Sequence, residues 1–286
     1  MRKTFLLLFS FVATSIFAQS GTEIYLFDLT KTENGYSISN PKNITNNPGY
    51  DNQPSFLLDD SGILMAATRD GQTDVALYDI ENEKLNFLMH TPGYSEYSPI
   101  QTPEGAFISF VILRNNGEQQ FWKITPGYED PIILESERIV GYYAWYDSDR
   151  YLSFILATDT SPATVQWHNS RTLDKKILGE NPGRSFHKMK NENALAYILK
   201  KEDVWEIQAY YPEKDESRFI TNTVPESEDM ALTPSGDIFM GKDSELFFFD
   251  GNRWASVADL SQYNLTGITR LAISNAGDKI AIVVDE

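Results

Sequence analysis

Short stretches of apolar residues, each preceded by a tight turn, recur along the chain at a nearly constant interval. The turns are residues 60–62, 103–105, 147–149, 191–193, 234–236 and 275–277, and successive third positions are 43, 44, 44, 43 and 41 residues apart. Each third position is Gly, Asp or Asn, residue types that tolerate the positive φ angle of tight β-connections. A strand of four to six β-prone residues is predicted after each turn, as in 63–67 and 106–111. The chain is therefore predicted to be a repeat protein built from strands.

A second predicted strand follows in five of the repeats, at residues 74–79, 120–124, 164–168, 205–210 and 245–250. The sixth repeat stops before its second strand. Residues 22–29 match that missing strand, and residues 36–45 supply an outer one. The N-terminal strands are thus predicted to complete the sheet that the C-terminal strands begin.

This pattern predicts an all-β fold, a six-bladed β-propeller with four-stranded antiparallel blades, whose last blade is closed by the N- and C-terminal strands. A closed ring of this kind leaves no free sheet edge along the array. Residues 19–286 are expected to form this single domain, because no linker or shift in composition divides them. An open two-sheet sandwich is the alternative, and the nearly equal spacings argue against it.

The first 18 residues have the pattern of a secretory signal peptide. Arg2 and Lys3 precede an apolar run from Phe5 to Ala18, and a small residue stands at the expected cleavage position. The run is shorter than the roughly 20 apolar residues that a membrane helix needs. A buried N-terminal strand or helix is the alternative interpretation. We expect an exported protein, periplasmic or secreted, with no membrane span.

Composition narrows the classes of partner. The chain has 41 acidic and 24 basic residues, a net charge of -17, so nucleic acid and anionic membrane surfaces would be repelled. It has no cysteine, which excludes disulfides, thiolate metal sites and a cysteine nucleophile. The expected partner is another envelope or secreted protein, bound by a monomer.

One repeat carries residues with a counterpart in a known family. Residues 53–56 hold a proline and an aromatic residue, residues 60–62 form the turn, and 68–71 read Thr-Arg-Asp-Gly before an acidic residue and a strand that ends at Tyr78-Asp79. This run resembles the repeat of the TolB-type β-propellers, and residues 98–117 resemble it less closely. The resemblance implies a propeller that serves as a binding platform. It does not extend to the additional N-terminal domain of TolB, since a blade strand directly follows the signal segment.

Ligands of a propeller meet the face where the outer strand of one blade connects to the inner strand of the next. Residues around the start of the predicted inner strands are therefore the candidate ligand-binding set. They are Asp51, Asn52, Glu96, Tyr97, Tyr142, Arg184, Glu228, Asp229 and Arg270. Carboxylates, tyrosines and arginines together suit a protein or a carbohydrate ligand. Solvated loop residues without a ligand are the alternative interpretation.

Signatures of catalysis are weak. The three histidines occupy different positions in their repeats, so they are not expected to converge, and no Gly-x-Ser-x-Gly motif occurs. No catalytic residue, cofactor or metal is assigned, and a non-enzymatic binding protein is the preferred interpretation. The enzymatic alternative is a metal-dependent hydrolase of the lactonase type. Its divalent cation would be held at the channel mouth by Asp51, Asn52, Glu96, Glu228 and Asp229.

Overall fold

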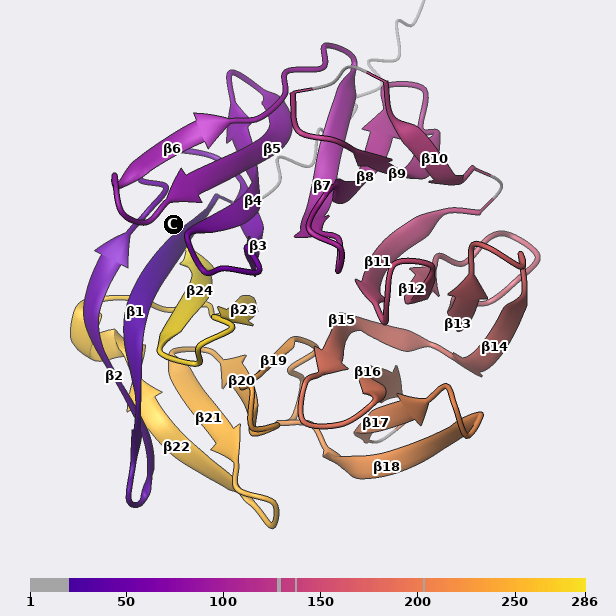
Figure 1. Ribbon diagram of the computed structural model, residues 1–286. Coiled ribbons are helices and arrows are strands. Elements are labelled where there is room, and N and C mark those ends of the chain that lie inside the picture. The colour runs from indigo at the N-terminus through magenta and orange to yellow at the C-terminus, as the bar shows by residue number, and fades with distance from the viewer. Residues whose placement is uncertain (1–20, 128–129, 137, 203) are drawn as a thin grey trace, which may run out of the picture.

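Six four-stranded antiparallel sheets form a ring around a central axis in the computed structural model, which describes residues 21–127, 130–136, 138–202 and 204–286 (Figure 1). The predicted six-bladed β-propeller is confirmed. The expected signal segment, residues 1–18, lies outside the described residues. Besides strands, the described ranges contain one 3-10 helix, η1(Leu260–Tyr263), and no helix within them is long and apolar enough to cross a lipid bilayer.

Each blade runs from an inner strand near the axis to an outer strand at the rim (Figure 1). The first blade consists of β3(Asp51–Phe56), β4(Gly62–Arg69), β5(Gln72–Asp79) and β6(Lys84–Phe87), and the second of β7(Tyr94–Gln101), β8(Ile108–Arg114), β9(Gln119–Ile124) and β10(Ile132–Glu135). The third blade consists of β11(Val140–Trp145), β12(Arg150–Ile155), β13(Thr164–Asn169) and β14(Lys175–Glu180), and the fourth of β15(Pro182–Met189), β16(Ala194–Lys200), β17(Trp205–Tyr211) and β18(Glu216–Asn222). The fifth consists of β19(Met230–Leu232), β20(Ile238–Lys242), β21(Glu245–Phe249) and β22(Trp254–Asp259).

The sixth blade, here the closing blade, joins the two ends of the described chain. It contains β23(Arg270–Ile273), β24(Lys279–Asp285), β1(Thr22–Thr32) and β2(Gly35–Asn43) in that order from the axis. β1 pairs with β24 from Thr22 opposite Asp285 to Asp28 opposite Lys279. The Nζ of Lys279 donates a hydrogen bond to Oδ1 of Asp28 at 2.9 Å. The predicted closure by N- and C-terminal strands is therefore confirmed.

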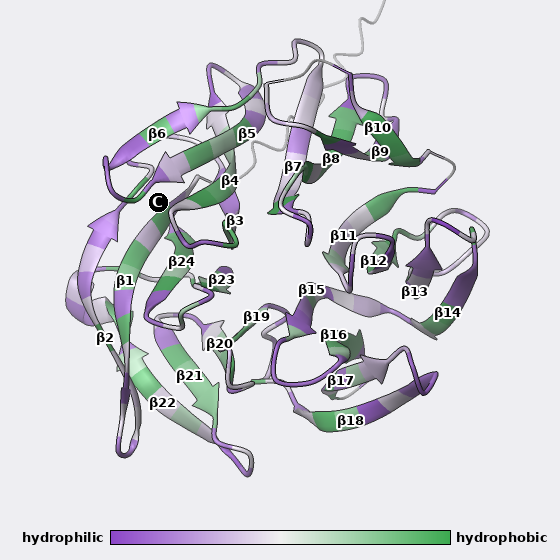
Figure 2. Ribbon diagram, viewed as in Figure 1, coloured by the Kyte–Doolittle hydropathy of each residue, from purple (hydrophilic) through white to green (hydrophobic). Residues whose placement is uncertain are grey.

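The apolar core lies between neighbouring blades, and hydrophobic residues concentrate on the strands that face each other there (Figure 2). In β1, Ile24 is fully buried in a cluster with Met65 of the first blade, whereas Phe27 is fully buried in a cluster with Phe239 of the fifth blade. Alternate residues serve two interfaces because side chains of a strand point to opposite faces of its sheet. Middle strands buried on both faces therefore read as nearly continuous apolar runs.

Three of the six turns lack the positive φ that was expected at their third position. Positive φ occurs at the expected third position in Gly105, Gly236 and Gly277, with values of 76°, 92° and 77°, but not in Gly62, Asp149 or Asn193. In the first blade the positive φ of 58° belongs to Asp60, because the hydrogen-bonded turn closes there, two residues before the predicted place. Gly62 has another role. A Cβ at this position would lie 2.9 Å from a backbone carbonyl oxygen of the neighbouring strand β5.

Loss of the closing pair is expected to unfold the whole ring rather than trim one end. Deletion of residues 279–286 removes β24 and exposes the edges of β1 and β23. The cooperative thermal transition followed by circular dichroism should disappear. A deleted protein that melts as cooperatively and at as high a temperature as the full chain would contradict ring closure.

A point substitution tests the same interface without removing chain. Phe27→Ala should lower the free energy of unfolding by about 3–5 kcal/mol, because it leaves a cavity between the closing and fifth blades. Phe219→Ala is the matched control, since Phe219 is 56% exposed on the outer strand β18. Its effect should stay within about 0.5 kcal/mol. Equal effects of the two substitutions in urea unfolding would show that burial between blades does not dominate stability.

Candidate functional site

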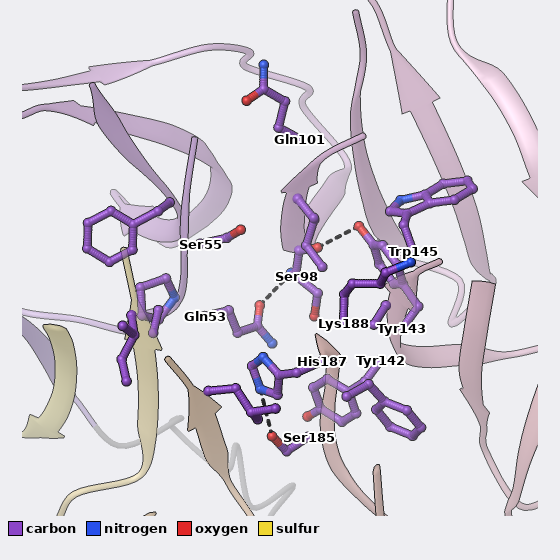
Figure 3. Close-up of a pocket in the computed structure, with 18 of the residues that line it drawn as sticks. Gln53, Ser55, Ser98, Gln101, Tyr142, Tyr143, Trp145, Ser185, His187 and Lys188 are labelled. Atoms are coloured by element: carbon purple, nitrogen blue, oxygen red, sulfur yellow. Dashed lines mark hydrogen bonds between the residues drawn. The ribbon is translucent and has the colours of Figure 1, made fainter. Parts of the chain in front are cut away.

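The inner strands surround a cavity of about 420 Å³ on the propeller axis. All six inner strands, or the residues next to them, contribute to its lining, and Figure 3 shows Gln53, Ser98, Tyr142, Tyr143 and His187 around it. A volume of this size lies within the range of roughly 300–1,000 Å³ that is usual for small-molecule sites. The centre of the ring is therefore the candidate functional site.

Irregularities in the inner strands help to aim side chains at the cavity. The pairing register shifts in β3, β7, β11 and β15, and Gln53 and Ser98 within these shifts have positive φ angles of 58° and 53°. Bulges of this kind redirect side chains. Ser98 N donates a hydrogen bond to Oε1 of Gln53 at 2.6 Å, and the Tyr143 hydroxyl donates one to Ser98 O at 2.8 Å (Figure 3). Polar contacts thus link three consecutive blades around the cavity.

Tyrosine and arginine side chains gather where the inner strands begin. We call Tyr50, Tyr97, Tyr142, Arg184 and Arg270 the tyrosine–arginine mouth. The rings of Tyr50 and Tyr97 meet edge to face with 6.3 Å between centroids, and the guanidinium carbon of Arg270 lies 4.7 Å from the centre of the Tyr142 ring. Burial raises the pKa of Tyr50 to about 12, and the charges of Arg270 and Arg184 oppose this rise. The mouth is therefore an aromatic and cationic rim.

Each arginine of the mouth has a carboxylate partner. Arg270 Nη1 lies 3.3 Å from Oδ2 of Asp229, whose other oxygen accepts a hydrogen bond at 2.9 Å from the backbone N–H that follows Arg270. Burial raises the pKa of Asp229 to about 6, and Arg270 opposes the rise. Arg184 Nε lies 3.5 Å from Oε1 of Glu228, and Lys200 pairs with Oε2 of Glu228. These pairs hold the arginines in place at the rim.

Asp51 and Asn52, at the start of β3, form hydrogen bonds with neighbouring strands and do not line the cavity. Asp51 is fully buried, and its Oδ1 accepts hydrogen bonds from Thr68 N at 3.1 Å and from Arg69 Nη1 at 2.9 Å. Burial raises the pKa of Asp51 to about 6 against the opposing charge of Arg69. Asn52 Nδ2 donates a hydrogen bond to Thr22 Oγ1 at 3.3 Å, which ties the first blade to the closing blade.

Glu96, at the start of β7, is buried between the first and second blades with 1% of its surface exposed. Burial first, and then the neighbouring carboxyl group of Asp74, raise the pKa of Glu96 to about 8. Its Oε2 is buried with no hydrogen-bond partner among the residues that the structure describes. Asp74 in turn lies 3.0 Å from Nδ1 of His90. Glu96 is therefore a protonated acid at neutral pH, buried between two blades.

The predicted site residues thus fall into three groups by position. Tyr142, Arg184, Asp229 and Arg270 line the cavity; Tyr97 and Glu228 lie at its rim; Asp51, Asn52 and Glu96 are buried between strands. The sequence-based set omitted Tyr50, His187, Lys188 and Lys190. A signal existed for Tyr50, since Pro-Gly-Tyr at 48–50 recurs at 92–94. The other three follow the bulge in β15, which nothing in the sequence marks.

Histidine chemistry in the cavity is limited to His187. His90 follows β6, His168 lies in β13 and His187 lies in β15, so the three side chains belong to three different blades. Burial lowers the pKa of His187 to about 4, and its Nε2 lies 3.0 Å from Ser185 Oγ. That hydroxyl also accepts a hydrogen bond from Met230 N at 3.0 Å, so it joins the fourth and fifth blades.

Groups of three or more His, Cys, Asp or Glu side chains able to hold a metal ion do not occur within the described ranges. The carboxylates that the sequence nominated for a cation have other partners. Asp51 and Asp229 each contact an arginine and a backbone N–H, and Glu228 contacts Arg184 and Lys200. This donor set does not fit a divalent cation without breaking those pairs.

Comparison with known proteins identifies the fold. No family model matches the chain, and neither does any curated protein. The structure is similar to a protein from Agrobacterium tumefaciens assigned as a TolB, with a TM-score of 0.70 and 11% identity over 94% of this chain and 99% of that one. The chain has the fold of the TolB-type β-propellers.

Two further solved structures mark the range of proteins with this fold. A gluconolactonase from Xanthomonas campestris matches with a TM-score of 0.63 and 8% identity over 94% of this chain and 99% of that one. TolB from Acinetobacter baumannii matches with a TM-score of 0.59 and 11% identity over 93% of this chain, which spans 64% of that protein's length. The TolB-type fold is shared by proteins of different activity, so function has to be argued from the site.

The raised pKa of Glu96 predicts a specific pH dependence of stability. The folded chain binds this proton more tightly than the unfolded chain, whose glutamic acids have a pKa of about 4.3. Ionisation of Glu96 therefore costs the folded state stability as pH rises from about 5 to the folded pKa of about 8, and no further above it. Glu96→Gln removes this cost. In urea unfolding across this range, the free energy of unfolding of the Gln variant should rise relative to that of the natural chain up to pH 8. Above pH 8 the difference between the two should stay constant.

Glu245→Gln is the matched control, because Glu245 is exposed at the start of β21. Its free-energy difference from the natural chain should not change with pH over this range. The assignment of a buried, protonated Glu96 is wrong if the Glu96→Gln difference is equally constant.

Proposed function

We propose that this protein is an exported, non-enzymatic binding platform of the bacterial periplasm or envelope, whose tyrosine–arginine mouth takes a segment of a partner protein. The observation that carries this proposal is the convergence of three tyrosines and two arginines at one rim. They come from five of the six blades. Tyrosine and arginine are the residue types most enriched where proteins bind each other tightly, and here a closed ring holds them in place.

Export is supported by the N-terminal segment. Residues 1–18 combine two basic residues, an apolar run and a small residue at the cleavage position. The net charge of -17 leaves nucleic acid a poor partner. We infer a monomer that meets another envelope or secreted protein.

Export has a direct test. The full chain, expressed in a bacterium with a C-terminal tag, should be recovered from the periplasmic or external fraction, shortened by about 18 residues at its N-terminus as judged by mass spectrometry. Changing Arg2 and Lys3 to Glu should reduce export. Recovery of the uncut chain from the cytoplasm would overturn the export proposal.

The lactonase-type alternative rests on the shared fold with the gluconolactonase. It needs several carboxylate oxygens free to bind one cation, whereas Asp229 and Glu228 at the rim are held by arginine and lysine side chains. Melting in the presence of Ca²⁺, Mg²⁺ or Zn²⁺ separates the two ideas, since an ion that binds only the folded chain raises the melting temperature. We expect no specific shift. A shift that Asp229→Asn abolishes would favour the enzyme.

The platform proposal predicts which variants lose the partner. Crosslinking of the exported protein in its own cells, followed by affinity capture and mass spectrometry, should yield one dominant partner. Tyr97→Ala and Tyr142→Ala should each reduce its recovery by about tenfold, the loss expected when a central aromatic residue is removed from an interface. Phe219→Ala, on the outer strand β18 of the fourth blade, should leave the recovery of the partner unchanged. A dominant partner recovered equally with all three variants would place binding elsewhere on the protein.

A further inference from the structure

The charge inside the ring is opposite to the charge of the whole chain. The net charge is -17, yet the cavity is lined by four basic side chains, Arg184, Lys188, Lys190 and Arg270, and by one carboxylate among the described residues, Asp229. Asp229 is already paired with Arg270. The positive charge that has no paired carboxylate is therefore that of Lys188 and Lys190, at the end of the cavity where the inner strands finish.

Neither lysine has an anionic partner in the part of the chain that the structure describes. Lys188 Nζ donates a hydrogen bond to Tyr146 O at 2.8 Å and lies 3.6 Å from the centre of the Tyr146 ring. Lys190 Nζ contacts Oδ1 of Asn275. Both partners are neutral. Burial lowers the pKa of each ammonium group, so both charges are incompletely compensated.

The acids nearest to these lysines are bound by other groups. Oxygens of Asp60 accept hydrogen bonds from Asn275 N at 2.7 Å, from Asn275 Nδ2 at 2.8 Å and from Ala276 N at 2.7 Å. Asp147 accepts one from Arg150 Nε at 2.7 Å. The charges of these two acids act on the lysines, but neither acid lines the cavity and no ion pair joins either of them to Lys188 or Lys190 in the described part of the chain. The lysines are therefore the charged groups that this end of the cavity presents to a ligand.

The rest of the lining near the lysines is aromatic or neutral and polar. Tyr143 and Trp145 of β11 form one wall beside Lys188 (Figure 3). Gln53 and His187 face the same space, and His187 is uncharged at neutral pH because burial lowers its pKa to about 4. Such groups exchange hydrogen bonds with hydroxyl groups without adding charge.

We propose that the lysine end of the cavity binds a small hydroxylated carboxylate of the sugar-acid class. Its carboxylate lies against Lys188 and Lys190, and its hydroxyl groups bond to Gln53 and His187. A lysine binds an anion as a point charge, whereas many phosphate sites add a free arginine fork or backbone N–H groups at a helix start, and both arginines of this lining are already paired with carboxylates. This site is separate from the tyrosine–arginine mouth, so it does not depend on the proposed protein partner.

Four small probes separate the contributions of charge and hydroxyl groups. Titration calorimetry of the full exported protein at low salt uses D-glucuronate, D-glucose, butyrate and inorganic phosphate. We expect D-glucuronate to bind, with glucose, which lacks the carboxylate, and butyrate, which lacks the hydroxyls, each at least about tenfold weaker. Absence of glucuronate binding overturns the proposal. Phosphate binding as tight as glucuronate also overturns it, in favour of a site for simple oxyanions.

Variants place the ligand at the lysines. Lys188→Gln and Lys190→Gln should each weaken glucuronate binding by about tenfold, and added salt should weaken it further in the natural chain. Lys190 stands in the turn after β15 and not within the strand, so its variant should fold even if Lys188→Gln does not. Lys84→Gln is the matched control, because Lys84 is exposed on β6, the outer strand of the first blade. This variant should bind glucuronate as tightly as the natural chain does. Unchanged binding in both cavity variants would overturn the assignment.

Discussion

The pairing of β1 with β24 is the constraint on which the rest of the structure depends. The other five blades are each contiguous in sequence and can pair their strands locally, whereas this pair joins Thr22 to Asp285 from opposite ends of the described chain. Until it forms, the first and fifth blades lack a complete neighbour, and Ile24 and Phe27 of β1, which pack against those two blades, stay exposed. The cavity depends on the same closure, because its lining comes from all six inner strands. Stability and site geometry are therefore set by one long-range contact.

Two buried acids between the blades show that the charge of the neighbouring side chain changes how strongly burial raises the pKa of a carboxyl group. Asp51 and Glu96 occupy equivalent places, two residues before the bulge residues Gln53 and Ser98. Asp51 faces Arg69 and has a pKa of about 6, whereas Glu96 faces the acidic Asp74 and has a pKa of about 8. Burial is the largest cause in both. An arginine offsets part of the desolvation cost, while a second acid adds to it and favours a shared proton.

The fold could be predicted from the sequence because the repeat consists of tight turns and apolar runs, which are local features of the chain. The ring, the blade order and the closure all follow from them. The site was less predictable. Asp51 and Tyr142 stand at similar places before or within inner strands, yet one is buried between strands and the other lines the cavity. Which way a side chain turns depends on a bulge of one residue, and bulges leave little trace in composition.

The strand β15 shows how one bulged element can present two kinds of chemistry. Its shift in pairing between Pro182 and Phe186 lets Arg184 reach the mouth, while His187 and Lys188 line the deeper cavity. Residues of a strand rise about 3.3 Å each, so Arg184 and Lys188 are separated by at most about 13 Å along it. A protein segment at the rim and a small acid at the lysine end would thus occupy neighbouring volumes without sharing a charged partner. In both proposals recognition rests on the few basic groups that the ring encloses, and not on the acidity of the chain as a whole.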